Sequence, residues 1–295
     1  MNAADSKIAG KVWIDGAVVD AALARVPVFD RGFLYGDSVY EVLRTFDGHP
    51  FALEEHLDRL EGSAARIEMS VPSRDEIRAA IDATCLAVGH PDLYIRIVVT
   101  RGAGEIGLDP ALADAPRLIL IVRPASLPSK EIYESGVEVA VVGRSRSIPG
   151  GPANTDPQVK SGNYLGSVLA VAEARRRGAY EAILGDAVGR ITEGSSSNIF
   201  LVRGGRITTP PLSSGLLEGI TRRTVIHLAR KNSIAVDEQP LWPADLARAD
   251  EAFLTSSVRG IVPIVRVDGI QIAGGRPGEV TRRVMSLYQQ FASAR

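Results

Sequence analysis

Few residues of this chain could supply a nucleophilic amine, because only five of its 34 basic side chains are lysines. Lys160 precedes the run SGNY at the start of a predicted helix over residues 161–177. The partial positive charge of a helix N-terminus lowers the pKa of a nearby lysine, and a lysine that attacks a carbonyl needs a lowered pKa. Lys160 is therefore a candidate for covalent chemistry, and the alternative is a solvated surface lysine.

Four other segments carry groups that could complete a site. Glu193 begins the run EGSSSNIF, which is either a catalytic acid in a tight loop or a polar connection. Residues 219–222 (GITR) open a helix whose backbone N–H groups could cradle a phosphate, although glycine and threonine also cap helices. Residues 255–257 (TSS) form an anion site or a turn. Arg59 lies on a helix, where it binds an anion or extends to solvent.

Strands and helices in mixed order must position these residues. In the first part we expect strands at 11–14, 39–45, 94–100 and 118–122, and helices at 54–66 and 74–87. In the second part we expect strands at 137–142, 182–184, 190–192, 199–202, 206–208, 253–254 and 261–267, and helices at 161–177, 221–230 and 277–291. The proline-rich stretch between the two parts predicts a linker. The fold class is α+β or mixed α/β, with domains at 1–123 and 132–295 joined by residues 124–131.

The composition excludes several classes of protein. The 295 residues carry a net charge of −1, so the basic excess of a nucleic-acid-binding protein is missing. One cysteine, Cys85, excludes an intrachain disulfide, and the four histidines lack metal-ligand spacing, so we expect no metal. No apolar run is long enough for a membrane span, and no signal peptide is apparent. We expect a cytoplasmic protein with neither nucleic acid nor membrane as partner.

Together, an amine, a carboxylate, hydroxyl groups, an arginine and a helix N-terminus are what a protein needs to hold pyridoxal 5'-phosphate. The chain resembles the class IV pyridoxal-phosphate aminotransferases, which have fold type IV, the two-domain fold of the branched-chain and D-amino-acid aminotransferases. The matching segments are residues 30–41, 55–60, 160–174, 193–200 and 219–222, in family order, within a match over residues 12–288. The branched-chain enzymes are the most similar members.

The resemblance implies a role for each cofactor-binding residue. Lys160 is implied to be the Schiff-base lysine and to carry the proton between substrate and cofactor. Glu193 is implied to face the pyridine nitrogen and keep it protonated, since a carboxylate favours a nearby cation. Tyr164 is implied to bind the phenolic oxygen of the ring and Leu217 to pack on its face. The implied phosphate ligands are Arg59, Gly219, Ile220, Thr221, Ser256 and Ser257.

The run Tyr94-Ile95-Arg96 distinguishes members of the family. Alternate strand residues share a face, so Tyr94 and Arg96 lie together. In the branched-chain enzymes such an arginine meets the side-chain carboxylate of glutamate or 2-oxoglutarate, while the same pocket takes leucine; a structural ion pair is the other interpretation. The implied substrate pocket also holds Tyr35, Tyr40 and Val258, together with Gly107 and Leu108, whose loop comes from the other subunit in the family. The predicted reaction converts leucine, isoleucine or valine and 2-oxoglutarate into branched 2-oxo acids and L-glutamate.

Several alternatives remain open. D-amino-acid aminotransferases share most of these motifs but carry Arg-x-His where this chain has residues 105–107 (EIG). (R)-amine transaminases, aminodeoxychorismate lyase and a pyridoxal carrier without turnover are further possibilities. Arg31, Arg44 and Arg101 add positive charge near the predicted pocket and would suit an unusual anionic substrate. The family builds its site from two subunits, so we expect a homodimer or a larger homo-oligomer.

Overall fold

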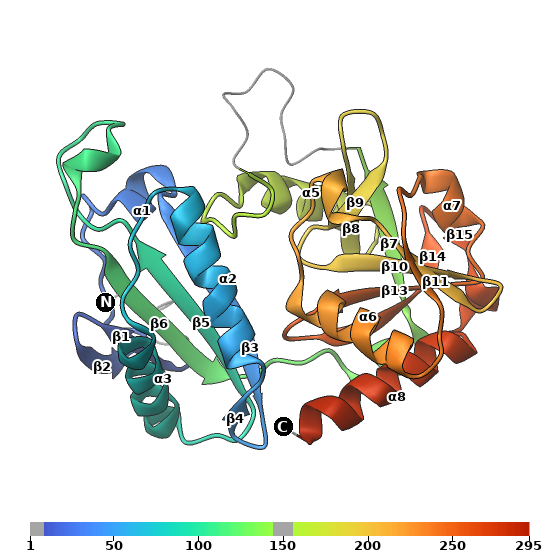
Figure 1. Ribbon diagram of the computed structural model, residues 1–295, viewed down its shortest axis with the longest axis horizontal. Helices are drawn as coiled ribbons and strands as arrows, with labels where there is room; N and C mark the ends of the chain where they lie inside the picture. Colours follow the sequence, from blue (N-terminus) through green and yellow to red (C-terminus); the bar gives the residue numbers. More distant parts are fainter. Residues whose placement is uncertain (1–8, 144–155, 295) are drawn as a thin grey trace. The chain divides into compact units, whose positions relative to one another are not determined.

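The computed structural model describes residues 9–143 and 156–294. Of the five lysines, Lys7 lies outside these ranges. The chain divides into two compact units (Figure 1). The first contains the residues up to Ser126 together with Val159–Asn163, and the second contains Leu127–Gln158 and Tyr164–Ala294. The predicted linker overlaps a strand that ends at Pro124 and a helix that begins at Lys130.

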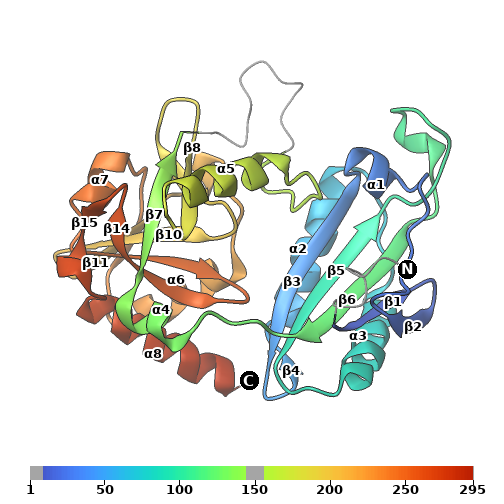
Figure 2. The same cartoon turned by 180° about the vertical axis from the view of Figure 1, so that it is seen from behind.

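An antiparallel sheet forms the first unit. Within the described residues it has six strands in the order β2-β1-β6-β5-β3-β4. The strands are β1 (Lys11–Ile14), β2 (Ala17–Asp20), β3 (Ser38–Phe46), β4 (His49–Pro50), β5 (Leu93–Thr100) and β6 (Arg117–Pro124). Helix α1 (Arg31–Tyr35) precedes β3, and helices α2 (Leu53–Arg66) and α3 (Arg74–Val88) cover one face of the sheet, as Figure 1 and the reverse view in Figure 2 show.

The core of the first unit lies between the sheet and these two helices. Ile95 and Ile97 of β5 are fully buried there, together with Leu57 and Leu60 of α2. The residues that alternate with them along β5 are only partly buried, because successive side chains of a strand point to opposite faces. Tyr94 and Arg96 therefore lie together on the sheet face opposite to α2 and α3.

A mixed sheet forms the second unit. Across its described residues the order is β12-β11-β10-β13-β14-β7-β8-β9, and β15 pairs with β14. The strands are β7 (Val137–Val142), β8 (Glu181–Gly185), β9 (Ile191–Gly194), β10 (Asn198–Arg203), β11 (Arg206–Thr209), β12 (Val236–Glu238), β13 (Glu251–Ser256), β14 (Gly260–Val267) and β15 (Ile270–Gln271). The helices are α4 (Lys130–Ser135), α5 (Leu165–Arg176), α6 (Ile220–Lys231), α7 (Pro243–Ala247) and α8 (Glu279–Ser293).

The prediction of a helix from residue 161 is wrong, because α5 begins only at Leu165. The preceding backbone pairs with β3 instead. Tyr40 N donates to Lys160 O at 3.0 Å, Gly162 N donates to Ser38 O at 3.0 Å, and Ser161 forms a bridge with Val39. Peptide groups bonded to a strand cannot start a helix. The helix-dipole argument for Lys160 fails as well, since the dipole acts only within the first turn of a helix.

Helix α5 also buries a different face from the one its leucines indicate. Ala170 and Ala174 are fully buried against β7 and β8, whereas Leu165, Val168 and Leu169 are exposed. Small side chains allow the helix to lie close to the strands. No helix among residues 9–143 and 156–294 has both the length and the apolar character needed to cross a membrane.

Candidate active site

Tyr40 is the centre of a cluster in the first unit. Its buried ring contacts the Lys160 amine, with Nζ 4.6 Å from the ring centroid, and the Arg96 guanidinium, with Cζ 4.2 Å from it. The register of β3 and β5 explains the second contact, because Tyr40 lies opposite Val98, two residues from Arg96 on the same face. Cations are attracted to an aromatic face. The main chain of Lys160 is fixed as well, since its N–H donates to Ser63 Oγ at 3.2 Å.

A buried carboxylate holds the arginine that the sequence assigns to a phosphate. Glu41 accepts from Arg59 Nε and Nη2, both at 2.7 Å, and lies 2.7 Å from His56 Nδ1. Burial alone would raise the pKa of the Glu41 carboxyl, but Arg59 and His56 outweigh it and hold this pKa well below its usual range. Glu41 is therefore ionised and fixes the plane of the Arg59 guanidinium.

His56 is the neutral member of this group. Burial lowers the pKa of its imidazole, and the positive charges of Arg59 and Lys160 lower it further, against the opposing effect of Glu41. Its Nε2 atom is buried with no hydrogen-bond partner among the described residues. A neutral ring that donates from Nδ1 to Glu41 agrees with both observations. A charged residue amid the apolar run of β3 is the signal that could have revealed Glu41.

The arginines that suggested an unusual anionic substrate have partners within the first unit. Asp37 accepts from Arg31 Nε at 3.0 Å and from Arg101 Nε at 2.7 Å, and these arginines keep the pKa of its carboxyl low despite burial. Arg101 also donates to two backbone carbonyls. Arg44 pairs with Asp92 at 3.2 Å. These three guanidinium groups form ion pairs within the first unit, so we assign none of them to a ligand.

Arg31 also fixes the loop after β5. It donates to Gly107 O at 2.9 Å and to Leu108 O at 3.4 Å, and Gly107 N donates to the Tyr35 hydroxyl at 3.1 Å. Three of the predicted pocket residues, Tyr35, Gly107 and Leu108, therefore lie together at one end of the unit. The side chain of Leu108 is 83% exposed.

In the second unit, Glu193 lies near the end of β9 and is buried. Its carboxylate accepts from Leu217 N at 3.2 Å, and Asn198 Nδ2 donates to Leu217 O at 3.0 Å, so the Leu217 backbone is held on both sides. Burial, with the nearby Glu193 charge, raises the pKa of the Tyr164 hydroxyl, which stays protonated at neutral pH. Glu193, Tyr164 and Leu217 thus form one cluster.

The start of α6 has the features of an anion site. Gly219 caps the helix without a side-chain hydrogen bond, and the first N–H groups of a helix have no partner within it. The hydroxyls of Thr221 and Thr255 are buried with no hydrogen-bond partner among the described residues, and α6 packs against β13. A Cβ at position 219 would overlap the Asn198 side chain, so glycine is required there. A group with several acceptor oxygens, such as a phosphate, fits these donors.

The predicted residues therefore fall into two sets. The first unit holds Tyr35, Tyr40, Arg59, Tyr94, Arg96, Gly107, Leu108 and Lys160, and the second holds Tyr164, Glu193, Leu217, Gly219, Ile220, Thr221, Ser256, Ser257 and Val258. Ser256 ends β13, and Ser257 and Val258 lie in the partly buried turn that follows it. Glu41, His56 and Asn198 belong to these clusters as well, and the sequence motifs did not assign a role to any of them.

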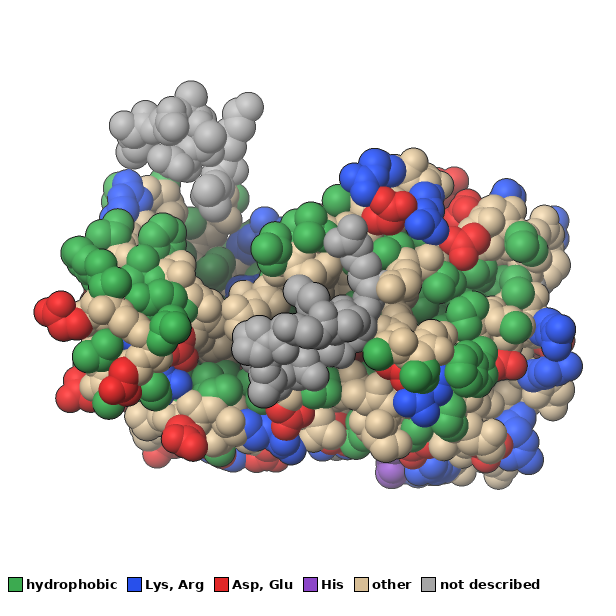
Figure 3. All heavy atoms as spheres, turned by 90° about the horizontal axis from the view of Figure 1, so that it is seen from above, with side chains coloured by type: hydrophobic (Ala, Val, Ile, Leu, Met, Phe, Trp, Pro, Cys, Tyr) green, Lys and Arg blue, Asp and Glu red, His purple; other side chains and the backbone are tan. Residues whose placement is uncertain are grey.

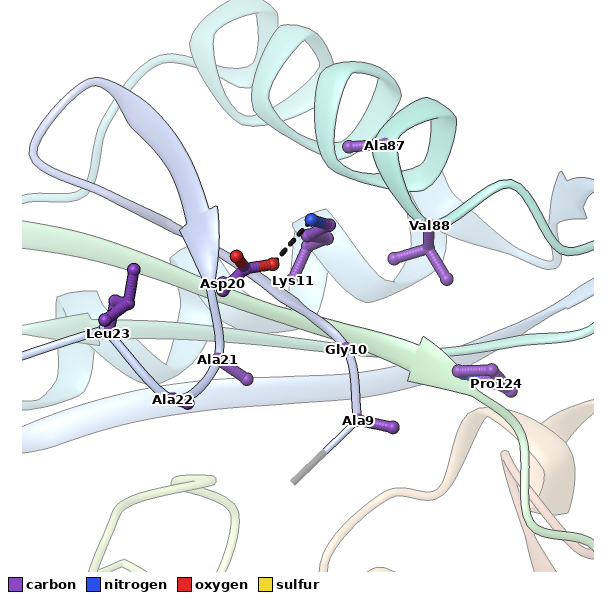
Figure 4. A pocket seen from close by; sticks show the side chains of 10 residues that line it. All are labelled: Ala9, Gly10, Lys11, Asp20, Ala21, Ala22, Leu23, Ala87, Val88 and Pro124. Carbon is purple, nitrogen blue, oxygen red and sulfur yellow. Dashed lines mark hydrogen bonds and ion pairs between the residues drawn. The ribbon is translucent and has the colours of Figure 1, made fainter. Parts of the chain in front are cut away.

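Other features of the surface add no chemistry to these sets. A hollow beside β1, β2 and the end of α3 contains the ion pair between Lys11 and Asp20, at 2.6 Å, among small apolar residues (Figure 4). None of the predicted site residues lines it. Within the part of the chain that the structure describes, no three His, Cys, Asp or Glu side chains come together as a metal site.

Comparisons with known proteins agree on one family. The sequence model of the class IV amino-transferase family matches residues 38–267 of this chain. A Methanocaldococcus jannaschii protein provisionally named a branched-chain-amino-acid aminotransferase is 40% identical over 95% of this chain and 96% of its own length. A D-alanine aminotransferase of Listeria monocytogenes is 33% identical over 95% of this chain and 94% of its own length. The branched-chain amino acid aminotransferase of Thermobaculum terrenum, solved in its PLP form, has a TM-score of 0.83 at 28% identity, covering 97% and 95% of the two chains.

Proposed function

Since this chain belongs to the class IV aminotransferase family, we propose that it transfers the amino group of L-leucine, L-isoleucine or L-valine to 2-oxoglutarate. The products are the branched 2-oxo acid and L-glutamate. The observation that carries the proposal is the Tyr40 ring, which contacts both the Lys160 amine and the Arg96 guanidinium. A reactive amine and a group that binds a carboxylate thus share one aromatic surface.

An aminotransferase of this kind must accept two unlike side chains in turn. The planar guanidinium of Arg96 suits the side-chain carboxylate of glutamate and 2-oxoglutarate. The aromatic and aliphatic surface around it suits the branched side chain of leucine. To that surface we assign Tyr35, Tyr40, Tyr94, Gly107, Leu108 and Val258. Arg96 is the arginine that we assign to substrate, because its guanidinium lies against the same Tyr40 ring as the Lys160 amine.

The cofactor that this reaction needs is pyridoxal 5'-phosphate, which when bound supplies the electron sink for the carbon that loses its proton. The buried hydroxyls of Thr221 and Thr255, which have no hydrogen-bond partner within residues 9–143 and 156–294, fit its phosphate. We assign the phosphate to Arg59, Gly219, Ile220, Thr221, Ser256 and Ser257. Arg59 suits this role because its donors form a planar fork that Glu41 holds in one orientation.

Three residues of the second unit would hold the cofactor ring. The Glu193 carboxylate would keep a proton on the pyridine nitrogen, because an anion favours a nearby cation. The raised pKa of the Tyr164 hydroxyl keeps its proton in place, so it would donate a hydrogen bond to the phenolic oxygen. Leu217, whose backbone is held by Glu193 and Asn198, would pack on the ring.

Lys160 would bond to the cofactor and then move the proton on the substrate. Its backbone bonds to Tyr40 and Ser63 fix the point from which the side chain extends. With the cofactor bound, Lys160 Nζ would be the base that takes the proton from the substrate Cα and carries it toward the cofactor. The ring of Tyr40 limits where Nζ can move.

A spectroscopic experiment tests the proposal. Purified full-length protein with pyridoxal phosphate should show a visible absorption band from the lysine-bound cofactor. L-leucine should bleach this band and 2-oxoglutarate should restore it. A Lys160→Ala variant should lack the band, and a Lys11→Ala variant, changed at a lysine paired with Asp20, should keep it.

Three results would contradict the assignment. If D-alanine or (R)-1-phenylethylamine bleached the band much faster than L-leucine, the protein would be a D-amino-acid or (R)-amine transaminase, an alternative that the Listeria relative supports. Release of pyruvate from aminodeoxychorismate would indicate the lyase. A cofactor that bound but did not respond to any amino donor would indicate a carrier.

We also propose a homodimer or a larger homo-oligomer. Exposed apolar side chains gather on segment 26–35 and on the loop after β5, and such surfaces mark protein contacts. This apolar surface consists of Val28, Phe29, Phe33, Leu34, Ile106 and Leu108. Figure 3 has hydrophobic side chains grouped on its left part, the side on which α1 lies in Figure 1. The free thiol of Cys85 suits a reducing compartment, and we propose a cytoplasmic location.

A further inference from the structure

One buried ion pair of the second unit has no role in the function proposed above. Glu181, the first residue of β8, is 2% exposed, and its Oε2 atom lies 2.6 Å from Arg259 Nη1. Arg259 belongs to the turn between β13 and β14, and the two residues are 78 positions apart in the sequence. No motif marked either residue.

The second carboxylate oxygen of Glu181 accepts hydrogen bonds from the turn that follows β9. Its Oε1 atom accepts from Ser196 N at 2.9 Å and from Ser197 Oγ at 2.8 Å. The hydroxyls of Ser195 and Ser196 lie 3.3 Å from the same atom. This turn comes directly after Glu193, so Glu181 fixes the backbone from which the Glu193 carboxylate extends.

The guanidinium of Arg259 reaches both turns. Its Nε donates to Ser256 Oγ at 3.2 Å, within its own turn, and its Nη2 donates to Ser196 Oγ at 3.1 Å, in the turn after β9. The Arg259 carbonyl accepts from the Tyr133 hydroxyl at 2.9 Å, and this bond also holds the backbone of the turn in place. Arg259 therefore connects the segment that begins at Glu193 with the segment that contains Ser256.

Stability alone is a poor reason for such a pair. Two buried charges lose their hydration, and apolar side chains of similar size often stabilise a fold as well or better. The burial of Glu181 would raise the pKa of its carboxyl, yet Arg259 and the serine donors outweigh that effect and keep the carboxyl ionised. What the pair supplies, and apolar packing would not, is directional bonds to two turns at once.

We propose that Glu181 and Arg259 are positioning residues that hold residues 194–197 and residues 256–259 at a fixed separation. This inference rests on the proposed function, in which Glu193 meets the ring nitrogen and Ser256, Ser257 and Val258 meet the phosphate and the substrate. Neither Glu181 nor Arg259 touches the cofactor in this scheme. They set the spacing of the groups that do.

Arg259→Lys is the most informative variant, because lysine keeps the charge opposite Glu181 but cannot donate to both turns. Glu181→Gln is the second variant, since it keeps an acceptor for the serines and removes the charge. Glu251→Gln is the matched control. Glu251 is a buried carboxylate at the opposite end of β13, where it accepts from Val280 N and Thr281 N at the start of α8.

For each full-length protein we would measure the dissociation constant of pyridoxal phosphate by equilibrium dialysis, the Tm without cofactor, and kcat and KM for L-leucine. We expect Arg259→Lys and Glu181→Gln to weaken cofactor binding by about tenfold or more, the scale of one lost charge-assisted hydrogen bond. We expect KM for L-leucine to rise as well. Glu251→Gln should lower the Tm and leave cofactor affinity unchanged.

The proposal is overturned if Arg259→Lys and Glu181→Gln lower the Tm as the control does but bind the cofactor like the wild type. If Glu181→Gln does not fold, Arg259→Lys decides alone, because it leaves no buried charge without a partner. A wild-type protein that fails to bind pyridoxal phosphate would overturn the proposed function itself. A wild type that binds, with variants that match it, overturns only the positioning role.

Discussion

Two carboxylates of the first unit, Glu41 and Asp37, each contact more than one basic side chain. Glu41 is enclosed by Arg59 and His56, and Asp37 by Arg31 and Arg101. Each of these two carboxylates therefore fixes an arginine, and Glu41 fixes Arg59, which we assign to the cofactor phosphate. The buried imidazole of His56 is the member of this group whose ordinary pKa, 6.5, lies near neutral pH.

Protonation of His56 should reduce the stability of the cofactor-free protein. The pKa of His56 is lowered in the fold from its ordinary value of 6.5, so the unfolded chain binds the proton more readily. The contribution of His56 is thus complete above about pH 6.5 and is lost as the pH falls toward the lowered pKa. The free energy of unfolding should fall in that interval by at most about 1.4 kcal/mol per pH unit.

Urea denaturation between about pH 8 and pH 5 measures this effect. The lower limit of pH 5 keeps the titration of Glu41 out of the measurement. Because the pKa of Glu41 is lowered in the fold, its contribution to stability is lost only below about pH 4.5, the ordinary pKa of glutamate. In His56→Asn, which keeps a donor for Glu41 but does not titrate, the slope should become smaller. An equal slope in both proteins would show that other groups titrate.

Secondary-structure elements were predictable where the determinants are local. Strands over residues 11–14 and 137–142 have the predicted bounds, and α3 begins as predicted because Ser73 caps it through Glu76 N. The short α1, between Asp30 and Gly36, and α4 were missed, because five or six residues show too little periodicity. The start of α5 was wrong because β3, distant in sequence, bonds to the backbone around Ser161.

The candidate site was predictable to a similar extent. Lys160, Glu193 and Gly219 lie in runs of neighbouring residues that resemble a family pattern, so the sequence was sufficient to select them. Glu41 and Glu181 act through partners that are distant in sequence, Arg59 and Arg259, and no local pattern announces such pairs. The structure was needed wherever one residue fixes another across the fold.

The start of α6 gives a prediction at the scale of one element. Thr221→Val should leave the cofactor-free protein as stable as before or slightly more stable, because it removes a buried hydroxyl that has no partner. The same change should weaken pyridoxal phosphate binding by about tenfold, since one donor to the phosphate is lost. Thermal unfolding and equilibrium dialysis measure the two effects.

Thr281→Val is the control for this experiment. Thr281 lies in α8, and its hydroxyl is also buried with no partner among the described residues. Its change to valine should have a similar effect on stability and none on cofactor binding. Equal cofactor affinities in the two variants would remove Thr221 from the phosphate site.

At the scale of the whole molecule, the apolar surface predicts association. Arg31 holds the backbone of Gly107 and Leu108, so Ile106 and Leu108 are presented to solvent on a fixed loop rather than folded inward. Phe33, on α1, is 69% exposed. Exposed side chains of this kind on an ordered backbone suit a contact with a second copy of the chain.

Phe33→Asp combined with Leu108→Asp should convert the homo-oligomer to a monomer, because it places two charges within an apolar contact. Light scattering during size-exclusion chromatography measures the mass. Leu86→Asp is the control, since Leu86 is 84% exposed on α3, apart from this surface, and should not change the mass. A wild-type protein that elutes as a monomer would contradict the proposal at once.

The first unit is interrupted in sequence, and this determines when Lys160 reaches its place during synthesis. The first residues of β3 pair with β5 on one side and with Val159–Asn163 on the other, although Leu127–Gln158 intervene. A ribosome releases the chain from its N-terminus, so all six strands of the first sheet emerge before residue 159. A nascent chain of that length contains every strand of this sheet but lacks the segment that pairs with the first residues of β3. Lys160, which we assign to the cofactor, is added only with the segment that pairs along that edge, so a chain that ends before residue 159 lacks both.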